Sequence, residues 1–275
     1  MALILTIDTT TTQSGVALVE GRGAGEAPVV RAVRRAVVTT HSEALLEMID
    51  AVLGEAGVRP PELAVIACAA GPGSFTGLRI GLATAKGLCL GLAKPLLLVP
   101  SLAALAIRVR PAEGTLHRRS PASVGPDAGK ARGEGRPEGL SGSLRGSGVL
   151  VVACIDAFKG EVYVGRYRGA DDQGPALTGE EETIAPARLA EELRARVAEG
   201  PVVLVGDGMA RWPELRVAGL TAIDEGPPDP VDVGRLAARR WARGEHDDLA
   251  GATPRYVRPS EAELMERQRA ASQQT

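Results

Sequence analysis

The stretch LILTIDTTTTQSGVALV (residues 3–19) decides the fold, because its pattern returns in the second half of the chain. An apolar run ends at Asp8, four threonines follow, and a second apolar run comes back, as expected for two strands joined by a tight polar turn. Residues 150–168, LVVACIDAFKGEVYVGRYR, repeat this order, with Asp156 at the end of the first run. The two openings therefore indicate two similar units in one chain.

The elements after each opening are predicted in the same order. A third strand is expected at 27–38 and at 176–184, and a helix follows at 41–56 and at 186–199. A buried strand and another helix complete each half. The order of elements is thus strand, strand, strand, helix, strand, helix, and it occurs twice. This order predicts an α/β protein with two subdomains, each a mixed sheet with helices on its faces.

Residues 110–148 interrupt the repeat, since 18 of these 39 residues are Gly, Pro or Ser. Such a segment cannot bury enough apolar surface to offset the entropy of ordering it, so we expect a disordered insertion. It would separate an N-terminal subdomain (1–109) from a C-terminal subdomain (149–275). Its charge of about +3 would permit contact with RNA, although a solvated linker is the favoured interpretation.

The composition, 44% hydrophobic and 24% charged with a net charge of −2, is that of a soluble protein without a strong field for RNA or membranes. Aromatic residues make up only 3%, which leaves few rings for base stacking and argues against a single-stranded nucleic-acid platform. Cys68, Cys89 and Cys154 lie among apolar residues and are predicted to be buried thiols rather than disulfides or metal ligands. Without a signal peptide or an apolar run of about 18 residues, the chain is expected to be cytoplasmic.

The glycine-rich stretch GPGSFTGLRIGLATAKGL (71–88) follows a buried strand and leads into an apolar helix that ends near Ala93. A turn of this kind before a helix can bind phosphate through backbone N–H groups. The spacing matches neither the phosphate-loop pattern nor the dinucleotide-binding pattern, which argues against a phosphate-binding loop.

Small residues set the packing of this helix. Each internal glycine costs about 1 kcal/mol relative to alanine, so the glycines need a compensating contact. Small residues at every fourth position let another backbone come close, and they form two such rows: Gly77, Gly81 and Ala85, and Ala83, Gly87 and Gly91. The spacing is compatible both with close packing on the chain's own sheet and with contact to a second chain.

Seven segments resemble, in chain order, those of the TsaB (YeaZ) family: LTIDTTTTQSGVAL, HSEALLEMI, GPGSFTGLRIGLATAKGL, LLLVPSLAALA, CIDAFKGEVYVGRY, GDGM and PRYVRPSEAE. The resemblance covers both halves and omits only the 110–148 insertion. It implies a duplicated actin-like ATPase fold (ASKHA, RNase H-like) made of two βββαβα subdomains, in agreement with the repeated openings.

The resemblance also implies a function in bacterial tRNA modification. The family serves the machinery that installs threonylcarbamoyl on N6 of adenosine 37 in tRNAs reading ANN codons, with the transferase TsaD and the ATPase TsaE as partners. Two metal-binding histidines of TsaD correspond here to Ser101 and Leu105, which cannot replace them. The chain is therefore expected to be a non-catalytic scaffold, or pseudoenzyme. It would form homodimers and TsaD heterodimers, contact tRNA only through the complex, and require no metal or cofactor.

The resemblance also implies a nucleotide site, which would involve the first phosphate turn of actin-like folds. That turn corresponds here to Asp8, Thr9, Thr10 and Thr12. An Asp at a strand end can hold Mg²⁺ through water, but Thr9 replaces the glycine usual in the kinases of this fold. Met209 and Trp212 also interrupt the glycine-rich adenosine motif. Weak or vestigial ATP or ADP binding is expected, and an ordinary β-turn is the alternative interpretation.

In the family, the helix within 71–93 and the 41–56 helix form the surface for the homodimer and for TsaD. This implies an interface of Leu45, Ile49, Gly77, Leu78, Ile80, Gly81, Leu82, Ala85 and Lys86. Two other functions stay open. One is an active small-molecule kinase or ATPase of the same fold with Asp8 and Asp156 as carboxylates. The other is a peptidase, for which no HExxH or Ser/His/Asp pattern is visible.

Overall fold

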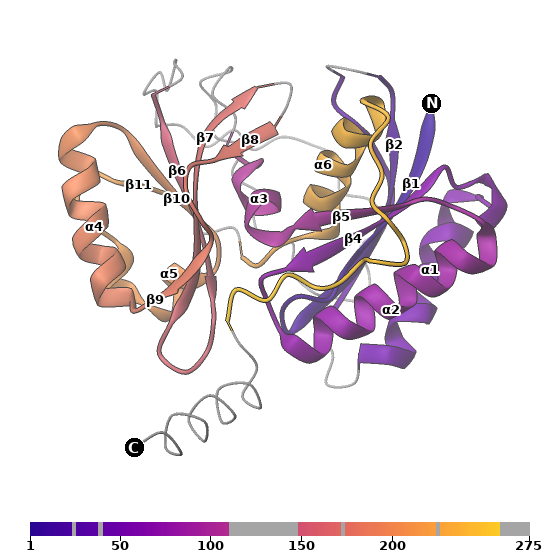
Figure 1. The fold of residues 1–275 in the computed structure, drawn as a ribbon, viewed down its shortest axis with the longest axis horizontal. Helices are drawn as coiled ribbons and strands as arrows, with labels where there is room; N and C mark the ends of the chain where they lie inside the picture. The colour runs from indigo at the N-terminus through magenta and orange to yellow at the C-terminus, as the bar shows by residue number, and fades with distance from the viewer. Residues whose placement is uncertain (24–25, 38–40, 110–147, 172–173, 224–225, 259–275) are drawn as a thin grey trace, which may run out of the picture.

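The structure is a computed structural model that describes residues 1–23, 26–37, 41–109, 148–171, 174–223 and 226–258. Its N-terminal half contains a five-stranded sheet of order β3-β2-β1-β4-β5 (Figure 1). The first three strands form an antiparallel meander, and the other two run parallel to the first: β1 (Ala2–Asp8), β2 (Gln13–Gly21), β3 (Val29–Val37), β4 (Val65–Gly71) and β5 (Leu96–Pro100).

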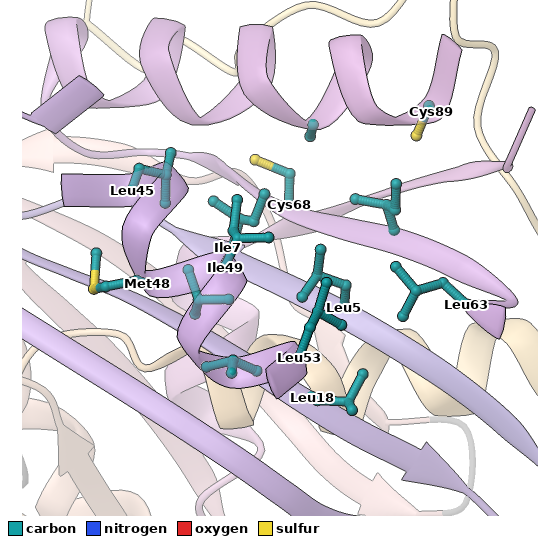
Figure 2. Close-up of a cluster of buried hydrophobic side chains, with 14 of the residues drawn as sticks. Leu5, Ile7, Leu18, Leu45, Met48, Ile49, Leu53, Leu63, Cys68 and Cys89 are labelled. Carbon is teal, nitrogen blue, oxygen red and sulfur yellow. The ribbon is translucent and has the colours of Figure 1, made fainter. Parts of the chain in front are cut away.

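Helices cover both faces of this sheet, because its central strands β1 and β4 are buried on both sides. Alternate residues of β1 point to opposite faces, so that Leu5 and Ile7 meet helices α1 (His41–Ala56) and α2 (Phe75–Leu92), as Figure 2 shows. Ile4 faces α3 (Ser101–Ala106) and α6 (Pro230–Ala242) on the other side, together with Val65 and Val99. The first sheet is thus the middle layer of three.

The second half repeats this arrangement with a sheet of order β11-β10-β6-β7-β8, in which β9 also pairs with β7. Its elements are β6 (Leu150–Asp156), β7 (Val162–Asp171), β8 (Gly174–Leu177), β9 (Glu182–Ile184), α4 (Pro186–Glu199), β10 (Val202–Val205), α5 (Gly208–Arg211) and β11 (Thr221–Ile223). Each half therefore has an antiparallel hairpin beside parallel strands. The predicted α/β class and the duplicated actin-like ATPase fold are confirmed.

The second half departs from the predicted pattern at two elements. The strand expected at 176–184 is two strands, β8 and β9, separated by a turn in which Gly179 has a φ of 107°. The helix after β10 is only the four-residue α5, because Pro213 disfavours helical geometry at Trp212, whose φ and ψ are −121° and 84°.

The division into halves in space differs from the predicted boundary at 149. Helix α6 returns to the N-terminal sheet and packs on β1 and β2 through an apolar stripe that includes Val231, Val233 and Leu236. Residues 246–258, named here the C-terminal strap, continue along this half past β5 and α2 and end beside the turn between β6 and β7 (Figure 1). The described residues of the C-terminal subdomain predicted at 149–275 therefore contact both sheets.

The predicted disordered insertion (110–148) lies outside the described residues, except for Gly148. The three cysteines are buried free thiols, as predicted, and burial raises the pKa of Cys89 to about 11. Within the described ranges, no helix is long and apolar enough to cross a membrane.

Candidate functional site

Asp8 lies at the end of β1, where the chain enters the threonine run. Its side chain is almost fully buried, and Oδ1 accepts hydrogen bonds from the Thr10 backbone N–H (2.9 Å) and hydroxyl (2.6 Å). Its Oδ2 is buried without a hydrogen-bond partner. Burial raises the pKa of Asp8 from 3.8 to about 6; Asp229 adds to this increase, whereas the Thr10 hydrogen bonds and Arg108 oppose it. The carboxyl group therefore titrates close to neutral pH.

The glycine-rich stretch packs directly against this turn. The Thr9 hydroxyl donates to the carbonyl oxygen of Gly77 at 2.7 Å, and the Ser74 N–H donates to that of Thr10 at 2.6 Å. A Cβ atom on Gly77 or Gly81 would overlap Thr9. This row of small residues therefore serves close packing on the chain's own first turn, one of the two possibilities that the spacing allowed.

The threonines predicted to face a nucleotide are brought together, but two of their hydroxyls are engaged inside the chain. Thr9 and Thr10 are each 1% exposed, and their hydroxyls donate to Gly77 and Asp8. Thr12 is exposed. Weak or vestigial nucleotide binding stays a prediction, and the hydrogen bonds of Thr9 and Thr10 hold this part of the turn inside the chain.

The second opening has a different electrostatic environment. Asp156, at the end of β6, pairs with Arg211 at 3.3 Å and accepts a hydrogen bond from the Trp212 indole N–H at 3.3 Å. Its own backbone N–H donates to Asp207 Oδ1 at 3.1 Å. The two carboxylates that an active kinase or ATPase would use therefore differ: Asp8 is buried without a cationic partner in contact, and Asp156 is ion-paired.

The two positions that correspond to the TsaD histidines lie in the core. Ser101 is fully buried at the start of α3, and its Oγ accepts a hydrogen bond from the Gly71 N–H at 3.2 Å. Leu105 is fully buried against the second sheet. Among the described residues, no group of three or more His, Cys, Asp or Glu side chains is arranged to hold a metal ion.

The helices α1 and α2 were predicted to present a partner surface, and that assignment stays a prediction, although the burial of the predicted residues is uneven. Seven of the nine predicted interface residues are covered by the chain itself: Leu45, Ile49, Gly77, Leu78, Gly81, Leu82 and Ala85. Ile80 is half-buried. Lys86 is also half-buried, and its Nζ donates to the carbonyl oxygens of Ala250 and Ala252 at 3.2 Å each, so it holds the C-terminal strap.

The solvent face of α2 carries the second row of small residues instead. Ala83, Gly87 and Gly91 are exposed, and a Cβ on Gly87 or Gly91 would meet nothing within 4 Å. Leu90 on the same face is 71% exposed, and Leu46 on α1 is 57% exposed. Sequence reasoning missed Leu90 as a surface residue, although its position seven residues after Ala83 places it on the same helix face. We call Ala83, Gly87, Leu90 and Gly91 the helix face.

Sequence comparison finds that this chain is similar to two kinds of tRNA-modification protein. The profile of the TsaD family, tRNA N6-adenosine threonylcarbamoyltransferase, matches residues 34–132. The tRNA threonylcarbamoyladenosine biosynthesis protein TsaB of Escherichia coli is 28% identical over 79% of this chain and 80% of that protein. The protein of the same name from Haemophilus influenzae is 26% identical over 93% of both chains. A tRNA N6-adenosine threonylcarbamoyltransferase of Novosphingobium aromaticivorans is 35% identical over 42% of this chain, but only 38% of its own length.

Solved structures agree with these sequence matches. YeaZ from Pseudomonas aeruginosa superposes with a TM-score of 0.67 at 28% identity, over 93% of this chain and all of that one. A second structure, an uncharacterized protein with similarity to peptidase YeaZ from the same organism, gives a TM-score of 0.69 at 28% identity, over 94% of this chain and all of that one. The similarity therefore extends through both sheets.

Proposed function

Because this chain belongs to the TsaB family and so has its role in tRNA threonylcarbamoyladenosine biosynthesis, we propose that it serves this pathway as a non-catalytic scaffold. It would bind a TsaD transferase, and TsaE through the resulting complex, while TsaD transfers threonylcarbamoyl to N6 of adenosine 37 in tRNAs reading ANN codons. A homodimer through the same surface would be the state of the protein without its partner.

The observation that carries this proposal is the helix face. A large apolar side chain, Leu90, is 71% exposed beside a ridge of glycine and alanine along which a second helix can approach closely. Exposed apolar groups of this kind are typical of protein interfaces. The TsaD match at residues 34–132 includes both α1 and α2, so a TsaD partner can offer helices of the same type. Such an arrangement would be pseudo-symmetric.

The proposal that the chain has no catalytic role is supported by the state of its polar groups. The hydroxyls of Thr9 and Thr10 are used within the chain, and Asp156 is neutralised by Arg211. Ser101 and Leu105 fill core positions where TsaD is expected to have metal ligands. A competing kinase or ATPase function would require the purified chain alone to turn over ATP, and an ATP hydrolysis assay measures this directly.

Size-exclusion chromatography with light scattering, on the chain alone and mixed with TsaD of its organism, tests the scaffold. The wild type is expected to form a homodimer and to convert to a heterodimer on mixing. Gly87→Arg places a long charged side chain on the helix face, where the structure has open space, and should abolish both species without unfolding the chain. Gly200→Arg, also in open space but at the end of α4, is the matched control. A Gly87→Arg variant that still forms the heterodimer would refute the proposed surface.

A further inference from the structure

The C-terminal strap begins on the first half of the molecule and ends on the second (Figure 1). Its first part is fixed on the first half, where the Asp247 N–H donates to the carbonyl oxygen of Leu96 on β5 at 2.8 Å. The ammonium group of Lys86 on α2 then holds the carbonyl oxygens of Ala250 and Ala252. The strap therefore reaches the second half from a fixed position on the first.

Arg255, near the end of the strap, contacts both halves. Its backbone N–H donates to the carbonyl oxygen of Ala70, in β4, at 2.7 Å. Its guanidinium reaches the second half, where Nη2 lies 3.4 Å from Glu181 Oε2. The strap fits closely here, because a Cβ atom on Gly71 would lie 2.6 Å from the Arg255 carbonyl oxygen. One residue thus links the carboxyl end of β4 to the loop between β8 and β9.

A second ion pair joins the strap to the second half. Arg258 pairs at 3.3 Å with Glu161, which lies in the turn between β6 and β7. The side chains of Arg255 and Arg258 are 48% and 27% exposed, so water reaches the arginine of each pair. We call the two ion pairs, Arg255–Glu181 and Arg258–Glu161, the clasp.

The clasp differs in chemistry from the connection between the halves through α3. Helix α3 joins the two sheets by fully buried apolar side chains, with Ala104 against the first sheet and Leu105 against the second. Separating such groups exposes apolar surface to water, which is costly. Ion pairs at a surface contribute little, because water solvates both charges once they separate. The α3 connection is therefore permanent, whereas the clasp can open without disturbing the core.

The burial of Glu181 favours an open state of the clasp. Its side chain is 2% exposed, and Oε1 accepts a hydrogen bond from the Tyr167 hydroxyl at 2.7 Å, but Oε2 is buried without a hydrogen-bond partner. Taking a carboxylate out of water costs free energy that one cation in contact repays only in part. Opening of the clasp would return this oxygen to water. The closed state gains an ion pair and the open state gains hydration, so the two oppose each other.

We propose that the clasp is a conformational switch, in which the Arg255–Glu181 pair holds the two halves closed and its release lets them move apart about α3. The strap crosses the carboxyl end of β4, the parallel neighbour of β1, so release would also open the sheet edge at which Asp8 lies. Ionic strength controls this switch, because salt at about 1 M reduces the Debye length to about 3 Å. The inference goes beyond the scaffold function and does not depend on dimerisation.

Double electron–electron resonance between nitroxide labels on the two halves of the full chain tests this inference. Ala51→Cys on α1 and Ala195→Cys on α4 supply exposed labelling positions, and the three native cysteines are buried. At low salt, Arg255→Gln should shift the distance distribution of the labelled chain to longer values. Arg31→Gln is the matched control, because Arg31 is 47% exposed and pairs with Glu20 inside the first sheet at 3.0 Å, so it should leave the distances unchanged.

Two further measurements separate the switch from a general loss of structure. Glu181→Gln, alone and combined with Arg255→Gln, should give the same shift as Arg255→Gln, because all three variants break one contact. Salt at about 1 M should produce this shift in the labelled chain with an unchanged strap, so the test does not depend on how well a variant folds. A distribution that stays constant in Arg255→Gln, or in the unchanged strap at about 1 M salt, would overturn the proposal.

Discussion

Asp8 is a buried carboxyl group whose surroundings raise its pKa toward neutral pH. The folded chain binds its proton more tightly than the unfolded chain, because burial raises the pKa from 3.8 to about 6. Its contribution to stability is therefore present at pH below the unfolded pKa and is lost as pH rises through the folded pKa. The shift corresponds to about 3 kcal/mol of unfolding free energy. At neutral pH the ionised Asp8 carboxylate therefore lowers the unfolding free energy. Asp229 differs, because it is ion-paired and its pKa is lowered.

The variant Asp8→Asn is expected to remove this pH dependence. The amide oxygen can still accept the two hydrogen bonds from Thr10, while the NH₂ group replaces the unpartnered Oδ2. The unfolding free energy of the variant minus that of the wild type should therefore rise by about 3 kcal/mol from about pH 3 to pH 7. Urea denaturation at a series of pH values measures this difference. A difference that does not change with pH would mean that Asp8 has the same pKa in the folded and the unfolded chain.

At the scale of elements, α2 differs between its buried and its solvent-facing side. Its buried row, Gly77 and Gly81, lies against Thr9, whereas Gly87 and Gly91 on its solvent side meet open space. Glycine is needed at Gly77 and Gly81, because the first turn lies too close for a Cβ atom. At Gly87 and Gly91 nothing is in contact, so glycine only lowers the stability of the helix. The two rows of small residues therefore have opposite effects on stability.

This difference predicts the outcome of a matched pair of substitutions. Gly77→Ala should lower the unfolding free energy by about 1–3 kcal/mol, because its Cβ would overlap the Thr9 backbone. Gly87→Ala should raise it by about 0.5–1 kcal/mol, since alanine has the higher helix propensity and meets open space. Thermal or urea unfolding of both variants gives the comparison. Equal effects of the two substitutions would contradict the assignment of the buried and exposed faces.

The elements also show what sequence reasoning can reach. The helices predicted at 41–56 and 186–199 match α1 and α4, because their apolar periodicity is determined by local sequence. The two rows of α2 could not be told apart, since both have small residues at the same spacing, and only tertiary contact with Thr9 distinguishes them. The contact between Phe75 and Tyr256 was missed for a related reason: these residues are 181 positions apart, so no local pattern brings them together.

At the scale of the whole molecule, several contacts join the two halves into one body. Helix α3 packs on both sheets, with Ala104 against the first and Leu105 against the second. Arg108, just after α3, forms a buried ion pair with Asp232 on α6 at 2.7 Å and donates to the Pro227 carbonyl oxygen at 2.7 Å. The C-terminal strap adds contacts from α2 to the second half.

This continuity predicts that the halves unfold together. Leu105→Ala removes a fully buried side chain between α3 and the second sheet, so it should lower the unfolding free energy by about 2–5 kcal/mol. Differential scanning calorimetry should show one transition, shifted as a whole, with calorimetric and van't Hoff enthalpies in agreement. Hydrogen exchange should accelerate in β1 as much as in β6, because each sheet loses its support when α3 detaches. Two separate transitions, with only the second half destabilised, would show instead that the halves fold independently and that α3 is not the link between them.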